Sequence, residues 1–168
     1  MEPLWAPWRM ELIEKGNTRP GCIFCVLPKE ASDRENLILG RTKYCFAILN
    51  RFPYNNGHLM VVPRAHISDI GALPREENDE LGEMLRIAVR LLGRAYGAQG
   101  YNVGMNLGVA AGAGIAHHLH WHVVPRWNGD TNFMPVIGDT KVMIEHLNAS
   151  WERLRPLFEK EFSTVSSW

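Results

Sequence analysis

The chain has 168 residues, which suits one compact domain, and its 18 basic and 18 acidic residues leave no formal net charge. Balanced charge gives no electrostatic attraction to a nucleic-acid backbone or an anionic membrane, and no apolar run approaches the roughly 20 residues of a membrane span. The first ten residues lack a secretory signal and three cysteines cannot all pair, so we expect a reduced, cytoplasmic protein with neither nucleic acid nor membrane as a partner.

A single domain is expected over residues 1–168, and it begins with an irregular arm. Residues 1–35 are rich in proline and tryptophan and carry a CxxC pair. Two short apolar runs follow at 44–50 and 58–63, separated by the turn-forming letters "RFPYNNG". This pattern predicts an antiparallel hairpin with a wide loop.

The segment between Pro74 and Gly97 has apolar residues at intervals of three and four, which predicts an amphipathic helix. Two more strands are predicted at 101–108 and 118–125, and the small-residue loop "GVAAGAGIA" joins them.

The last segment, residues 140–168, is expected to be a helical extension. It contains a second predicted helix over 141–155, which Pro156 should kink or end. Strands and helices mix along the chain without βαβ alternation. The predicted fold class is therefore α+β, an antiparallel sheet with helices packed on one side.

Three histidines occupy alternate positions in "AHHLHWHVV": His118, His120 and His122. On a strand they share one face, whereas His117 points to the other. The row spans about 13 Å, so one metal ion cannot bind all three. Three interpretations stand: an ordinary surface strand, a metal site that uses one or two histidines, and nucleophilic attack on phosphorus by an imidazole. The neighbouring loop favours the third, because small residues let backbone N–H groups approach a phosphate.

The segment "HLHWHVV" resembles the His-φ-His-φ-His-φ-φ signature of the histidine triad family of nucleotide hydrolases and transferases. The segment "LNRFPYNNGHLMVVPRAH" is similar to the nucleoside-binding hairpin of that family, and "GMNLG" is similar to the strand before the triad. Three further segments are most similar to the branch that contains the diadenosine tetraphosphate phosphorylases: "LWAPWRM", "HVVPRW" and "GDTNFMPVIGDTKV".

The resemblance implies roles for five residues. His120 matches the nucleophile that attacks the α-phosphorus, and His122 matches the histidine that contacts the phosphate and assists proton movement. His58 matches an outlying histidine near the α-phosphate. Asn50 resembles the residue that holds the ribose hydroxyls, and Asn106 resembles one near the phosphate and the triad. The family needs no metal for the chemical step.

The loop before the triad departs from the family pattern. Many members carry a glutamine that touches the leaving group, and the phosphorylase branch has a small hydroxyl residue where this chain has Gly114. Backbone contacts from Gly112, Ala113 and Gly114 are expected to replace that side chain at the nucleotide.

The CxxC pair, Cys22 and Cys25, supplies two of the four ligands of a structural zinc ion. Redox chemistry and two unpaired core cysteines are the alternatives. The resemblance implies that His66 and His118 complete a structural zinc site. His118 then faces the metal, whereas His120 and His122 face the phosphate.

The expected function is cleavage of a dinucleoside polyphosphate, such as diadenosine tetraphosphate, at the α-phosphate through a covalent nucleotidyl-histidine. Inorganic phosphate or water is the acceptor. The alternatives are hydrolysis of a nucleoside phosphoramidate and a nucleotide-binding zinc protein without turnover. By analogy with the family, we expect a homodimer or a higher homo-oligomer.

Overall fold

The computed structural model describes residues 21–131, 137–138 and 142–164. Its elements follow one another in this order: α2 (Ile23–Val26), a 3₁₀ turn (Leu27–Lys29), β1 (Ile38–Arg41), β2 (Cys45–Leu49), β3 (Leu59–Pro63), a 3₁₀ turn (Ile70–Ala72), α3 (Arg75–Tyr96), β4 (Gly100–Gly104), a 3₁₀ turn (Val109–Ala111), β5 (Trp121–Arg126) and α5 (Leu147–Thr164).

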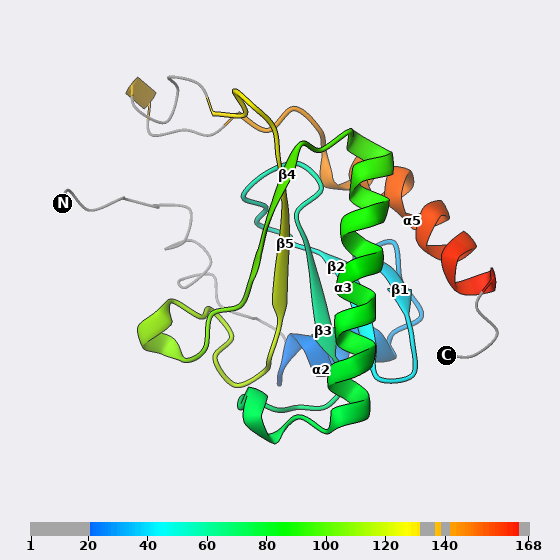
Figure 1. The fold of residues 1–168 in the computed structure, drawn as a ribbon, viewed down its shortest axis with the longest axis vertical. Coiled ribbons are helices and arrows are strands. Elements are labelled where there is room, and N and C mark those ends of the chain that lie inside the picture. The colour runs from blue at the N-terminus through cyan, green and yellow to red at the C-terminus, as the bar shows by residue number, and fades with distance from the viewer. Residues whose placement is uncertain (1–20, 132–136, 139–141, 165–168) are drawn as a thin grey trace.

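The five strands form one antiparallel sheet in the order β1-β2-β3-β5-β4 (Figure 1). The hairpin β2–β3 pairs Cys45 with Pro63 and Leu49 with Leu59, as the apolar runs predict. On the other side of β3 lies β5, with Met60 opposite His122. Residues opposite one another on antiparallel strands share a face, so this pairing fixes which side of the sheet carries the histidine.

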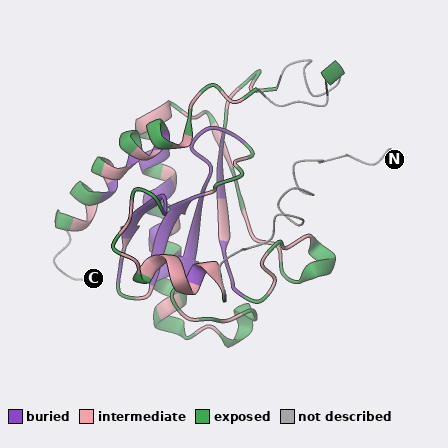
Figure 2. Cartoon of the chain, turned by 180° about the vertical axis from the view of Figure 1, so that it is seen from behind, coloured by how far each residue is buried: buried purple, intermediate pink, exposed green. Residues whose placement is uncertain are grey.

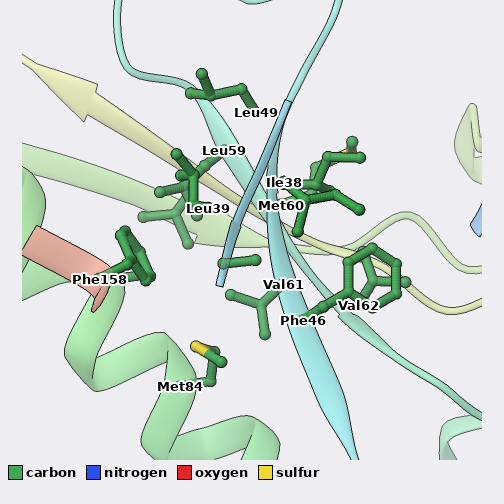
Figure 3. Close-up of a cluster of buried hydrophobic side chains, with 14 of the residues drawn as sticks. Ile38, Leu39, Phe46, Leu49, Leu59, Met60, Val61, Val62, Met84 and Phe158 are labelled. Atoms are coloured by element: carbon green, nitrogen blue, oxygen red, sulfur yellow. The ribbon is translucent and has the colours of Figure 1, made fainter. Parts of the chain in front are cut away.

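The helix α3 covers one face of the sheet and packs on β2, β3 and β5 (Figure 1). It is amphipathic, and it ends at Gly97, whose φ of 59° is the left-handed conformation that glycine adopts readily at a helix C-terminus. α5 packs on β1 and α3. Figure 3 shows Met84 of α3 and Phe158 of α5 directed at the strand side chains of this core. The α+β class and the antiparallel sheet are confirmed.

The short α2 lies across the opposite face of the sheet, towards its lower end in the view from behind (Figure 2). Its buried anchor is Phe24, whose ring centroid is 6.5 Å from that of Phe46 on β2. The described part of the arm that we expect to be irregular therefore contains α2 and a 3₁₀ turn, and an aromatic contact of Phe24 holds it to the sheet.

The predicted histidine strand is shorter than expected. Strand β5 begins at Trp121, so His118 and His120 precede it and only His122 lies within it. The backbone N–H of Leu119 donates to the carbonyl of Ile67 at 2.7 Å, which ties this segment to the connection after β3. The prediction of a strand that begins at His118 is therefore wrong, because the strand begins at Trp121.

The second helix also differs from its prediction. It begins at Leu147 rather than 141, and it runs through Pro156 to Thr164 instead of ending there. A proline inside a helix removes one hydrogen bond and costs about 3 kcal/mol. Tertiary packing outweighs that cost, because Phe158 is fully buried beyond the proline and Phe162 packs against the core.

Candidate active site and metal centre

The three predicted catalytic histidines, His58, His120 and His122, lie together on the face of the sheet opposite α3. His58 immediately precedes β3, and its Nε2 is 3.0 Å from Nδ1 of His122 on β5. The ring centroid of His120 is 5.1 Å from that of His122. Residues separated by 64 positions in the chain thus form one cluster, because β3 and β5 are neighbours in the sheet.

Hydrogen bonds assign the tautomers of His58 and His122. The backbone N–H of Tyr54 donates to Nδ1 of His58 at 3.0 Å, so the proton of a neutral His58 is on Nε2. That Nε2–H donates in turn to Nδ1 of His122. A neutral His122 therefore carries its proton on Nε2, from which it can donate a hydrogen bond to a phosphate oxygen.

His120 has the opposite tautomer. Its Nδ1–H donates to the backbone carbonyl of His118 at 2.9 Å, so the lone pair is on Nε2. Burial lowers the pKa of His120, and the hydrogen bond to the carbonyl opposes that shift only in part. A neutral imidazole with a lone pair on Nε2 has the form of a nitrogen nucleophile.

The predicted nucleotide-binding asparagines lie near the histidine cluster and the loop before it. Asn50 accepts the backbone N–H of Phe52 at 2.9 Å, and its Nδ2 is 3.4 Å from Nε2 of His58. Asn106 follows β4, and its Nδ2 donates to the carbonyl of Gly112 at 3.5 Å. The structure thus brings Asn50 to His58 and Asn106 to the loop before the triad.

The loop residues are arranged less favourably than expected for binding phosphate. The N–H of Gly112 donates to the carbonyl of Val109 at 2.9 Å, and the N–H of Ala113 donates to Gly108 at 3.3 Å. Gly112 has a φ of 82°, which a side chain rarely adopts. Two of the three predicted amides therefore serve the turn itself, and Gly114 follows it as an exposed residue.

The four predicted metal ligands gather at one point. Their ligand atoms, the Sγ atoms of Cys22 and Cys25 and the Nδ1 atoms of His66 and His118, lie within 4.8 Å of one another. The nitrogen-to-sulfur separations are 3.2, 3.4 and 3.6 Å, and the two nitrogens are 3.3 Å apart. Tetrahedral zinc separates nitrogen from sulfur by about 3.6 Å and two nitrogens by about 3.3 Å. The cluster fits zinc.

His118 is oriented for this cluster by the backbone. Its Nε2–H donates to the carbonyl of Pro63 at 2.9 Å, which leaves the lone pair on Nδ1 among the sulfurs. Burial lowers the pKa of His118, so the ring stays neutral, as a metal ligand must be. Neither Cys22 nor Cys25 is in a disulfide bond, so both thiols can bind a metal.

Several residues that the sequence did not single out contact the histidines. The ring of Phe24 lies between His118 and His120, and the ring of Tyr54 is 4.7 Å from that of His58. Asn55 donates to Asp130 at 2.9 Å and so ties the hairpin loop to the end of β5. The sequence signals for Phe24 and Tyr54 are an apolar residue inside CxxC and an aromatic residue in the turn. Asn55 has no comparable signal.

A cavity of about 610 Å³ opens beside His122 on the face of the sheet opposite α3. Residues from the hairpin loop, from β4 and from β5 line it, with polar groups such as Asn102, Asn106 and Arg126 among them. Its volume is within the usual range of small-molecule sites.

Part of the resemblance lies outside the described residues. The segment "LWAPWRM" falls in 1–20, and "GDTNFMPVIGDTKV" falls largely in 132–136 and 139–141.

Within the described part of the chain, no helix is long and apolar enough to cross a membrane.

Comparison with known proteins agrees with this geometry. A model of the HIT domain matches residues 31–129. A Mycobacterium tuberculosis protein named AP-4-A phosphorylase is 40% identical over 151 residues, which cover 85% of this chain and 77% of that protein.

Solved structures with the same fold include a Zn-bound histidine triad family protein from Mycobacterium smegmatis. Its TM-score is 0.67 at 24% identity, over 86% of this chain and 98% of that one. A Plasmodium falciparum diadenosine triphosphate hydrolase has a TM-score of 0.59 at 18% identity, over 79% and 80% of the two chains. Because the family model covers more than half of the chain and the mycobacterial relative is similar along most of it, this protein belongs to the HIT domain family and is a HIT-family enzyme.

Proposed function

We propose that the protein cleaves a dinucleoside polyphosphate at the α-phosphorus, with His120 as the nucleophile. The observation that carries the proposal is the pair of opposite tautomers, with a lone pair on Nε2 of His120 and a proton on Nε2 of His122. Similarity to a relative named AP-4-A phosphorylase supports diadenosine tetraphosphate as the substrate.

The reaction has two displacements at phosphorus. In the first, the lone pair of His120 Nε2 forms the N–P bond, and the bond from the α-phosphorus to its bridging oxygen breaks. His122 enters this step in its protonated form, gives the proton of Nε2 to the departing oxygen and is left neutral. In the second, an oxygen of inorganic phosphate or of water attacks the same phosphorus and gives its proton back to His122, and the N–P bond breaks to restore neutral His120.

We also propose that Cys22, Cys25, His66 and His118 hold a zinc ion with a structural role. Zinc would join α2 to the segment before β5, and no step of the chemistry needs it. The donor set, the tetrahedral separations and the orientation of His118 support this assignment.

A cytoplasmic homodimer completes the proposal. Free thiols suit a reducing compartment. In the described part of the sheet β4 is an edge strand, and edge strands can pair with a second copy.

Product analysis tests the function. Diadenosine tetraphosphate is incubated with the purified protein, with and without inorganic phosphate. ADP and ATP formed only with phosphate indicate phosphorolysis, AMP and ATP indicate hydrolysis, and no turnover contradicts the proposal. His120→Ala is expected to lose turnover and keep nucleotide binding, and His117→Ala serves as the matched control. Substantial residual activity in His120→Ala would remove His120 as the nucleophile.

A further inference from the structure

We propose that the cavity beside His122 binds the departing nucleotide, which in diadenosine tetraphosphate is the second nucleoside with its remaining phosphates. This inference rests on the proposed function and assigns a place to the half of the substrate that never becomes attached to His120.

The direction of the reaction leads to this cavity. In a displacement at phosphorus, the attacking and leaving atoms lie roughly in line on opposite sides. The leaving oxygen must also lie within reach of the group that protonates it. That group is Nε2 of His122 in the proposed reaction, and His122 lines the cavity, so the departing oxygen leaves His120 in the direction of this space.

The floor of the cavity follows from strand register. Gly104 pairs with His122 and Asn102 pairs with Val124, so these four residues share the face opposite α3. Gly104 adds no side chain beside the histidine, and a Cβ built there would meet no heavy atom within 4 Å. The space next to His122 is therefore open because β4 has a glycine at this position.

The walls supply groups that suit a nucleotide. Arg126 donates to Oδ1 of Asn102 at 3.0 Å, which leaves the amide N–H groups of Asn102 to face a phosphate oxygen. Arg126 also pairs with Asp130, so the lining adds no large positive charge. Tyr54 lines the cavity, is 40% exposed and offers an aromatic surface to a base. Phosphate oxygens would thus be bound mainly by amide donors.

Asn102→Asp tests the proposal with two substrates that share the AMP half. Diadenosine tetraphosphate has a large anionic leaving group, whereas adenosine 5′-phosphoramidate releases only ammonia. The added carboxylate repels phosphate oxygens, so we expect kcat/KM for diadenosine tetraphosphate to fall at least tenfold and that for the phosphoramidate to change less than twofold. Asn78→Asp adds the same charge at an exposed position of α3 and is the matched control.

Gly104→Val tests the volume of the cavity independently of charge. Valine is favoured in strands, the position has no left-handed φ, and the added side chain would project beside His122. We again expect kcat/KM to fall for diadenosine tetraphosphate and to change little for the phosphoramidate. The thermal unfolding midpoint of each variant establishes that it is folded.

The outcomes separate the two proposals. A wild-type protein that turns over neither substrate contradicts the proposed function. If the wild type is active on both substrates but Asn102→Asp lowers both rates equally, or lowers neither, the cavity is not the site of the departing nucleotide.

Discussion

The aromatic ring of Phe24 packs against the imidazole of His120, with centroids 5.1 Å apart and planes inclined at 42°. The same ring meets His118 edge-on at 5.4 Å. Phe24 lies between the two cysteines of CxxC and is 1% exposed. One buried side chain therefore connects the metal-ligand cluster to the proposed nucleophile.

Phe24→Leu is expected to lower kcat roughly tenfold and to leave KM and zinc content unchanged. Leucine keeps the site apolar, at a cost to stability of about 1 kcal/mol, but cannot support the flat face of the imidazole. Steady-state kinetics with metal analysis measures both properties. An unchanged kcat would show that the contact only fills space.

Zinc removal should destabilise the protein. We expect close to one zinc ion per chain in the wild type, and Cys25→Ser should lose the metal and lower the unfolding midpoint by roughly 10 °C. His117→Ala, beside a ligand but outside the ligand set, is the control and should keep the metal. A stable wild-type protein without metal would contradict the zinc site.

The effect of His122→Ala should depend on whether the leaving group needs a proton. Removing a general acid typically lowers the rate by a factor of about 10² to 10⁴ when the departing oxygen is basic. The loss should be largest for adenosine 5′-phosphoramidate, whose nitrogen cannot leave without a proton, and much smaller for the p-nitrophenyl ester of AMP, whose leaving group needs none. Equal losses for that ester and for the phosphoramidate would argue against a proton donor.

Gly40→Ala should destabilise the protein by about 1–3 kcal/mol, because a Cβ at this position of β1 would overlap the ring of Phe162 on α5. Chemical denaturation measures the change. Phe162→Leu in the same chain should recover much of the loss. Gly82→Ala on α3, where a Cβ meets nothing within 4 Å, should stabilise instead.

Acid should weaken the contact between the hairpin loop and β5. The Arg126 guanidinium, together with the backbone N–H of Trp127, holds the pKa of Asp130 well below its usual range. A carboxyl group whose pKa is lower in the folded state stabilises the fold above its unfolded pKa of about 3.9 and loses that contribution as the pH falls further. Asp130→Asn should therefore flatten the acid side of the stability profile. An unchanged profile would contradict this role.

Local patterns in the sequence predict much of the fold. The period of α3, its stop at Gly97 and the hairpin of β2 and β3 are all visible in short windows. Strand β1 escapes detection because "ILGR" is short, contains glycine and is paired with a register shift. The passage of α5 through Pro156 is hidden because distant packing of Phe158 decides it.

In the candidate site too, some features have a sequence signal and others do not. Residue types and a family resemblance bring Cys22, Cys25, His66 and His118 to attention, and the structure places them together. The contact of Asn55 with Asp130 joins residues 75 positions apart and has no local sequence signal. The hydrogen bonds that decide the tautomers of the histidines depend on backbone carbonyls and amides, which every residue possesses.

His118 offers its side chain to the metal cluster and its main-chain carbonyl to His120. The acceptor that fixes the nucleophile is thus a peptide group, which no single-codon change at position 118 can delete. Replacement of the His118 side chain can abolish metal binding and still preserve this hydrogen bond, provided that the backbone keeps its path. A mutation at position 118 therefore leaves the hydrogen-bond acceptor of His120 in place. A side-chain acceptor such as a carboxylate would be lost by a single substitution.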